Sequence, residues 1–263
     1  THEAKNLAKG NEYSFLHIIK PEIDLPDKTD LYSNQVYEKA KENFLRFTEK
    51  KILIQDTQKN FYLYKQVWGD HTQIGLVAAA SVEDYQNNII KKHELTREDK
   101  ERDRKKHIQS LNAQTGPVFL TFKQNPKIDL LFEKAMKKEP DYQFTSQDQV
   151  EHIFFVIEDR ELIQSIQQEF ALIPTLYVAD GHHRSAAASL IKSEKENQNQ
   201  NHTGDEEYNF FLSVLFPHSQ MKILAYNRVI KDLPGLCKAE FFLHASKHFN
   251  HKEAEYKIPL RKH

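Results

Sequence analysis

A short segment in the C-terminal half of the chain combines residue types that bind anions. Asp180 and Gly181 follow an apolar run, and His182, His183 and Arg184 come directly after them. Glycine permits a tight turn and the close approach of a ligand. The N–H groups that begin a helix bind phosphate together with basic side chains. The segment therefore predicts a phosphate-binding turn between a strand and a helix.

The same turn also has a purely structural interpretation. Asp180 can cap the helix, and Arg184 can pair with Asp180 four residues away. We favour the anion site, because two histidines and an arginine after a glycine turn are poor choices for a cap alone.

A second segment of interest is the charged stretch at residues 91–106, where eight Lys or Arg residues stand against five Asp or Glu residues. On a helix, Arg97, Arg104 and His107 share one face. They would supply positive charge to a phosphate from the side opposite the turn. Most charge-rich helices are solvated surfaces held by pairs four residues apart, and that alternative stays open here.

The elements that must position these residues follow from periodicity. Alternating apolar residues rich in β-branched and aromatic side chains predict strands. These strands are expected at residues 14–19, 61–68, 74–80, 118–122, 152–157, 175–179, 208–216 and 223–230. Helices are expected at residues 34–50, 82–90, 97–111, 128–138, 160–170 and 183–192. With a hairpin turn at 69–72, this mixture predicts an α+β fold, a mixed β-sheet with packed helices.

Local signals refine this outline. Ser81 and Thr96 are predicted N-caps, because each is followed three residues later by a carboxylate. Residues 193–207 are polar and of low complexity, which predicts a flexible loop. We expect residues 1–263 to form a single α+β domain that is a fragment of a longer chain.

Composition narrows the function classes. Lys plus Arg (37) nearly equals Asp plus Glu (38), so nucleic acid is an unexpected partner. No apolar run approaches the roughly 20 residues of a membrane span. A single cysteine, Cys237, fits a reducing, cytoplasmic compartment. No Cys or His spacing typical of zinc is present, so no metal site made by the protein alone is expected. Composition leaves the oligomeric state open.

Several separated blocks are similar to a widespread bacterial family. The blocks are residues 93–107, 111–118, 179–184, 208–211 and 226–228. The family is the one catalogued as domain of unknown function 1015. Its members usually begin earlier, with a Pro-Pro-Tyr-Asp segment, and extend further. The resemblance therefore implies a fragment, and it implies no settled activity.

The turn itself has a more distant similarity. Gly181, His182, His183 and Arg184 resemble the nucleotide-phosphate turn of the ParB/sulfiredoxin superfamily. Free-serine kinases of that superfamily bind ATP or ADP at such a turn and phosphorylate a small hydroxyl substrate, with a glutamate as base. This resemblance implies a ParB/sulfiredoxin-like nucleotide-binding element embedded in the sheet.

Together these features lead to one hypothesis and one alternative. The hypothesis is a nucleotide-dependent phosphotransferase that uses ATP or ADP with Mg²⁺ and acts on a small hydroxylated metabolite, free L-serine first. The predicted phosphate-binding residues are Gly181, His182, His183, Arg184, Arg97, Arg104 and His107. The predicted catalytic residues are Asp180 or Asp103, for Mg²⁺ or the acceptor hydroxyl, and Glu94 as base, with a residue of the expected preceding segment as the alternative base. The alternative is a non-catalytic regulatory module that senses a nucleotide or another anion.

Overall fold

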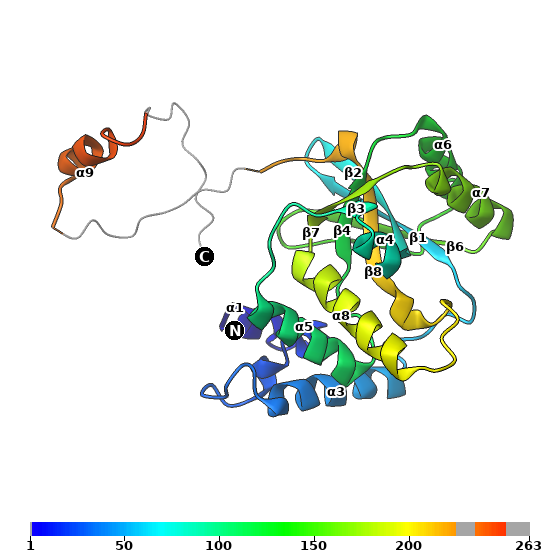
Figure 1. Cartoon of the computed structure of the whole chain (residues 1–263), viewed down its shortest axis with the longest axis horizontal. Coiled ribbons are helices and arrows are strands. Elements are labelled where there is room, and N and C mark those ends of the chain that lie inside the picture. The colour runs from blue at the N-terminus through cyan, green and yellow to red at the C-terminus, as the bar shows by residue number, and fades with distance from the viewer. Residues whose placement is uncertain (1, 225–234, 251–263) are drawn as a thin grey trace. The chain divides into compact units, whose positions relative to one another are not determined.

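The computed structural model describes residues 2–224 and 235–250 (Figure 1). Backbone contacts divide the chain into two compact units, Thr1–Met221 and Lys222–His263. Each unit is described by itself below. The single domain over residues 1–263 stays a prediction.

The first unit contains a mixed sheet of eight strands in the order β3-β7-β4-β8-β2-β1-β6-β5. The strands are β1 (Phe61–Trp68), β2 (His71–Ser81), β3 (Ile90–Lys91), β4 (Val118–Phe122), β5 (Tyr142–Thr145), β6 (Glu151–Ile157), β7 (Leu176–Asp180) and β8 (Phe210–Pro217). β3 pairs with β7, and β4 with β8, in parallel; the other neighbours are antiparallel. The predicted mixed sheet is confirmed.

The described residues contain nine α-helices. They are α1 (His2–Ala8), α2 (Leu16–Ile19), α3 (Asn34–Glu49), α4 (Val82–Gln86), α5 (Glu98–Leu111), α6 (Pro126–Ala135), α7 (Arg160–Ala171), α8 (His182–Gln198) and, in the second unit, α9 (Lys238–Ala245). Helix α5 packs between α3 and α8, while α6 and α7 pack together elsewhere on the sheet (Figure 1). No helix in the described ranges is long and apolar enough to cross a membrane.

Two hydrophobic clusters hold these elements in place. The larger joins the inward side chains of the sheet, such as Leu63 and Leu120, to Ile128 of α6 and Ile166 of α7, and all four are fully buried. The smaller consists of the buried residues Ile18, Ala40, Phe47 and Leu111. Because it joins α2, α3 and α5, this second cluster fixes the charged helix α5 from one side.

Two local predictions are wrong. Residues 14–19 were expected to form a strand, but Leu16–Ile19 is the helix α2. A short apolar run has no reliable period, and burial of Ile18 beside α3 and α5 decides the outcome. Thr96 is not an N-cap, since α5 has Arg97 at that position and no side-chain cap. Ser81 does cap α4, accepting from Asp84 N at 3.1 Å.

The loop predicted at residues 193–207 begins later than expected. Helix α8 continues to Gln198, because its polar residues find partners. Glu194 accepts from Lys105 and Gln109 of α5, and Lys192 pairs with Glu196 at 3.2 Å. Residues 193–198 of the low-complexity sequence are therefore helical.

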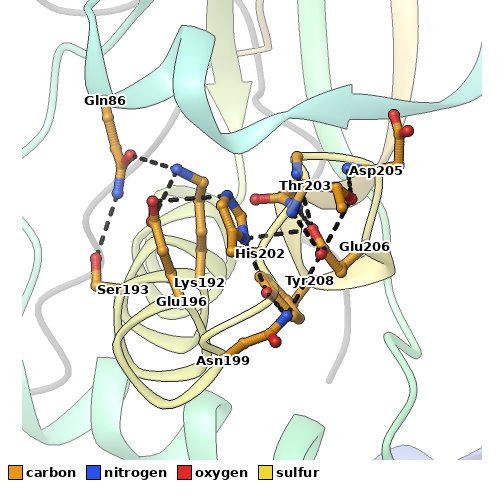
Figure 2. Close-up of polar contacts among 12 residues, drawn as sticks. Gln86, Lys192, Ser193, Glu196, Asn199, His202, Thr203, Asp205, Glu206 and Tyr208 are labelled. Atoms are coloured by element: carbon orange, nitrogen blue, oxygen red, sulfur yellow. Dashed lines mark hydrogen bonds and ion pairs between the residues drawn. The ribbon is translucent and has the colours of Figure 1, made fainter.

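The residues after α8 are held by a polar network (Figure 2). His202 lies between two carboxylates, 3.6 Å from Glu196 and 3.3 Å from Glu206, and bonds Tyr208 Oη at 2.9 Å. Desolvation raises the pKa of Glu206, but hydrogen bonds from the backbone N–H groups of residues 203 and 204 outweigh it and lower this pKa to about 2. The network links the end of α8 to the start of β8.

The strand predicted at 223–230 lies almost entirely outside the described residues, and residues 223 and 224 belong to no element. In the second unit, α9 begins with a capping box in which Cys237 Sγ accepts from Glu240 N and Glu240 accepts from Cys237 N.

Candidate functional site

The predicted turn connects β7 to α8 through Gly181, whose φ of 96° and ψ of 24° are left-handed. A side chain at this position would place its Cβ 3.2 Å from Val118 Cα in β4, so the turn passes close to the neighbouring backbone. Arg184 N and Ser185 N donate to Gly181 O at 2.9 and 3.1 Å. The N–H groups before them have no partner within the helix and form its positive end.

The Arg184 side chain is the main cation of the turn. Its guanidinium lies against Gly116, where an added Cβ would sit 2.9 Å from Nε and 3.0 Å from Nη2. It is partly buried and makes no hydrogen bond or ion pair with a residue in the described ranges. Burial, and then the charge of Arg104, lower the pKa of Arg184, while Asp180 opposes them. Two arginines thus share a region where neither neutralises the other.

Arg104 reaches this region from α5. Its Nε lies 4.0 Å from Oδ2 of Asp103. Asp103 in turn accepts a hydrogen bond of 2.9 Å from Tyr37 Oη in α3. The structure therefore brings Arg104 to the turn and directs Asp103 towards α3.

The segment before α5 lies directly against the first turn of α8. Glu94 Oε2 is 3.4 Å from His182 Nδ1. The ring of His93 stands edge-on to His182 with centroids 4.4 Å apart. The two charged segments identified in the sequence therefore meet.

The two histidines of the turn differ in their environments. His182 is only 2% exposed, and its Nε2 has no hydrogen-bond partner among the residues that the structure describes. Burial, and then the charge of His93, lower its pKa, so the ring is neutral near pH 7. His183 Nε2 lies 3.3 Å from Arg97 N and accepts from it, which leaves Nδ1–H as a donor.

Two predicted phosphate ligands have their side chains in other contacts. The Arg97 guanidinium is 70% exposed and binds Asp99 through two bonds of 2.7 and 3.1 Å. His107 is buried, and its Nε2 bonds Ile18 O at 3.0 Å. Burial lowers the pKa of His107, so this ring supplies a structural contact between α5 and α2.

His93 and Gly116 were not assigned roles from the sequence. His93 lies within the charged segment that was singled out. Gly116 follows Gln114, whose side chain bonds Phe210 O at 2.9 Å and Leu212 N at 2.7 Å and so ties this loop to β8. The signal was the Gln-Thr-Gly-Pro run just before β4. A polar residue two positions before a glycine is too common to predict a functional site by itself.

Asp180 ends β7 and is exposed beside the turn. Within the described part of the chain, no three or more His, Cys, Asp or Glu side chains gather in a way that would hold a metal ion. One carboxylate at the turn is compatible with Mg²⁺ that is carried mainly by phosphates.

This geometry defines a mixed-sheet α+β protein with a cationic turn at a helix N-terminus. The family model described as "Protein of unknown function (DUF1015)" matches residues 1–263. The chain belongs to that family, which confirms the resemblance seen in the sequence. No curated protein and no solved structure matches the chain.

Proposed function

We propose that this protein is a nucleotide-dependent phosphotransferase that acts on a small hydroxylated metabolite, with free L-serine the first acceptor to test. One observation carries the proposal. The partly buried Arg184 has no ion-pair partner among the described residues, and it lies near Arg104 at the N-terminal end of α8. An anion with several charges would neutralise both arginines at once.

A nucleotide phosphate chain has the right chemistry for this position. Phosphoryl transfer gains most of its rate from positive charge placed around the transferred group. Here the helix N-terminus and His183 Nδ1–H would lie on one side of the phosphates, and Arg104 on the other. We therefore include ATP or ADP with Mg²⁺ in the proposal, with Asp180 beside the metal. The turn would then act as a ParB/sulfiredoxin-like element.

The partners in this proposal are the nucleotide and a small-molecule acceptor. Both are abundant in the cytoplasm, which is where we place the activity. The sequence is nearly neutral, with a formal charge of −1, and this does not favour nucleic acid.

The test is ATP turnover in the presence of Mg²⁺ and L-serine, followed by ADP release and by phosphorus NMR of the product. We expect a phosphate monoester in the wild type and its loss in Arg184→Ala. Arg102→Ala is the matched control, because Arg102 is an exposed arginine of α5. Binding of ADP without transfer to any of a panel of hydroxylated metabolites would favour the sensing module. No binding of nucleotide would contradict the phosphotransferase and the nucleotide sensor, and would leave a sensor of another anion as the function.

A further inference from the structure

His182 combines features that the binding of phosphate does not explain. It opens α8, its side chain is almost completely buried, and Nε2 has no partner in residues 2–224 or 235–250. The other ring nitrogen, Nδ1, faces the Glu94 carboxylate at 3.4 Å. A carboxylate beside Nδ1 favours the tautomer with hydrogen on Nδ1, which leaves a lone pair on Nε2.

We infer that His182 Nε2 accepts the proton of the acceptor hydroxyl, and that Glu94 is the positioning residue that orients the ring through Nδ1. This inference rests on the proposed phosphotransferase function. It changes the expected roles of both residues, since Glu94 was predicted to be the base and His182 a phosphate ligand.

The neighbouring groups favour His182 over Glu94 and His183 as the residue that accepts the proton. The Glu94 side chain is 58% exposed, so water competes for its oxygens. His183 already uses Nε2 to accept from Arg97 N. Of the two histidines in the described turn, His182 is the one whose Nε2 lone pair no protein donor occupies.

The step balances without a further reactant. The acceptor O–H bond breaks and its proton moves to His182 Nε2, while the acceptor oxygen forms a bond to the γ-phosphorus. The bond from that phosphorus to the β–γ bridging oxygen breaks, and ADP leaves with the electron pair. His182 then returns the proton to water.

Several charged and titratable groups face the His182 ring. They come from His93 and Glu94 before α5, Asp180 of β7 and His183 of α8. Burial and His93 lower the pKa of His182, whereas Glu94 and Asp180 raise it. The geometry carries the assignment, because the buried Nε2 has no donor among the described residues and Glu94 lies at Nδ1. Because Nε2 is buried, the acceptor must displace a neighbour, and the exposed His93 ring is in direct ring contact.

The first test needs no turnover. Nitrogen NMR of histidine-labelled protein should show His182 as the Nδ1–H tautomer in the wild type. In Glu94→Gln the pKa of His182 should fall further, because a charge that raises it is lost. Glu98→Gln, which removes an exposed carboxylate from the first turn of α5, should leave that pKa unchanged. An Nε2–H tautomer, or the same pKa in Glu94→Gln, would overturn the inference.

The second test uses kinetics. His182→Gln should lower kcat by about 100-fold to 10,000-fold, the usual contribution of a general base, with ADP affinity within twofold of the wild type. Glu94→Gln should move the acid limb of the kcat/KM profile to lower pH, and Glu98→Gln should not.

Turnover above one tenth of the wild-type rate in His182→Gln would overturn this inference and leave the phosphotransferase function standing. Absence of turnover in the wild type would overturn the phosphotransferase function and, with it, this inference. If His182→Gln does not fold, Glu94→Gln tests the inference through the pKa of His182 and the acid limb of the kcat/KM profile.

Discussion

Arg184 illustrates how one side chain can mark a site. A partly buried guanidinium usually has a carboxylate partner, because an unpaired buried charge is costly. Here the guanidinium lies on the backbone of Gly116 and near Arg104, and Asp180 acts only at longer range. This arrangement is unfavourable in isolation and becomes favourable when a multivalent anion binds.

The contact with Gly116 gives a prediction that separates binding from folding. Gly116→Ala should displace the guanidinium, because the new Cβ would lie about 3 Å from Nε, Nη2 and Cζ. The guanidinium is the flexible end of a long side chain, so the free energy of unfolding should change by less than about 1 kcal/mol. ADP affinity should fall about tenfold, roughly 1.4 kcal/mol. Calorimetric titration and urea unfolding measure the two quantities, and unchanged ADP affinity would contradict the proposed contact.

At the scale of elements, the site depends on how a strand passes into a helix. β7 stops at Asp180, Gly181 takes a conformation that L side chains avoid, and α8 begins at His182. The glycine is required twice, by its φ of 96° and by the nearness of Val118 Cα.

Substitution of this glycine should therefore cost more than that of another left-handed glycine. Gly181→Ala should lower the free energy of unfolding by about 2 kcal/mol or more, beyond the roughly 1–2 kcal/mol of a left-handed backbone. Gly69→Ala in the β1–β2 turn shares the positive φ but has nothing within 4 Å of the added Cβ, so only the backbone cost applies. Urea unfolding of both variants tests the difference. Equal costs would mean that the approach to Val118 is not tight.

The elements also show what the sequence could and could not predict. The strong alternation of 61–68 and 118–122 matches β1 and β4 residue for residue. β5 was missed because its alternation consists of only two aromatic residues, Tyr142 and Phe144, within four residues. The end of α8 was missed because its support comes from α5, through Glu194.

At the site too, features that depend on contacts between distant segments could not be predicted from the sequence. The turn at 180–184 was predicted because glycine, histidine and arginine there have a local chemical meaning. His107 was predicted to bind phosphate, and its bond to Ile18 O could not be foreseen because it depends on the packing of α2. The Glu94–His182 pair was not foreseen as a pair, because it joins residues far apart in the sequence.

At the scale of the whole molecule, helix α5 links the turn to the N-terminal helices. One side meets α8 through Lys105 and Gln109, and the other meets α2 and α3 through His107 and Leu111. Any change that loosens α5 from α2 and α3 should therefore also reach the site.

His107 provides a pH-dependent measure of this packing. Its folded pKa is lower than the ordinary value near 6.5. The unfolded state thus binds more protons, and the stability from the buried neutral ring is present above pH 6.5 and lost as pH falls. His107→Ala should cost about 2–3 kcal/mol at pH 7.5 through the lost hydrogen bond and packing. This cost should shrink at pH 5.5.

Urea unfolding of the wild type and His107→Ala at both pH values measures this effect. His2→Ala, at an exposed histidine of α1, is the control and should stay within about 0.5 kcal/mol of the wild type at each pH. A cost for His107→Ala that is the same or larger at pH 5.5 would mean that the ring is not held neutral.

A double-mutant cycle on ADP binding with Arg104→Ala and Arg184→Ala tests whether the turn and α5 form one anion site. If the two arginines hold one phosphate chain, Arg184→Ala should weaken binding by roughly 1.5–3 kcal/mol. Arg104→Ala should weaken it as well, and the double variant should depart from additivity by at least about 0.5 kcal/mol. Wild-type affinity in either single variant, or additive losses within about 0.3 kcal/mol, would show that the turn and α5 do not form one anion site.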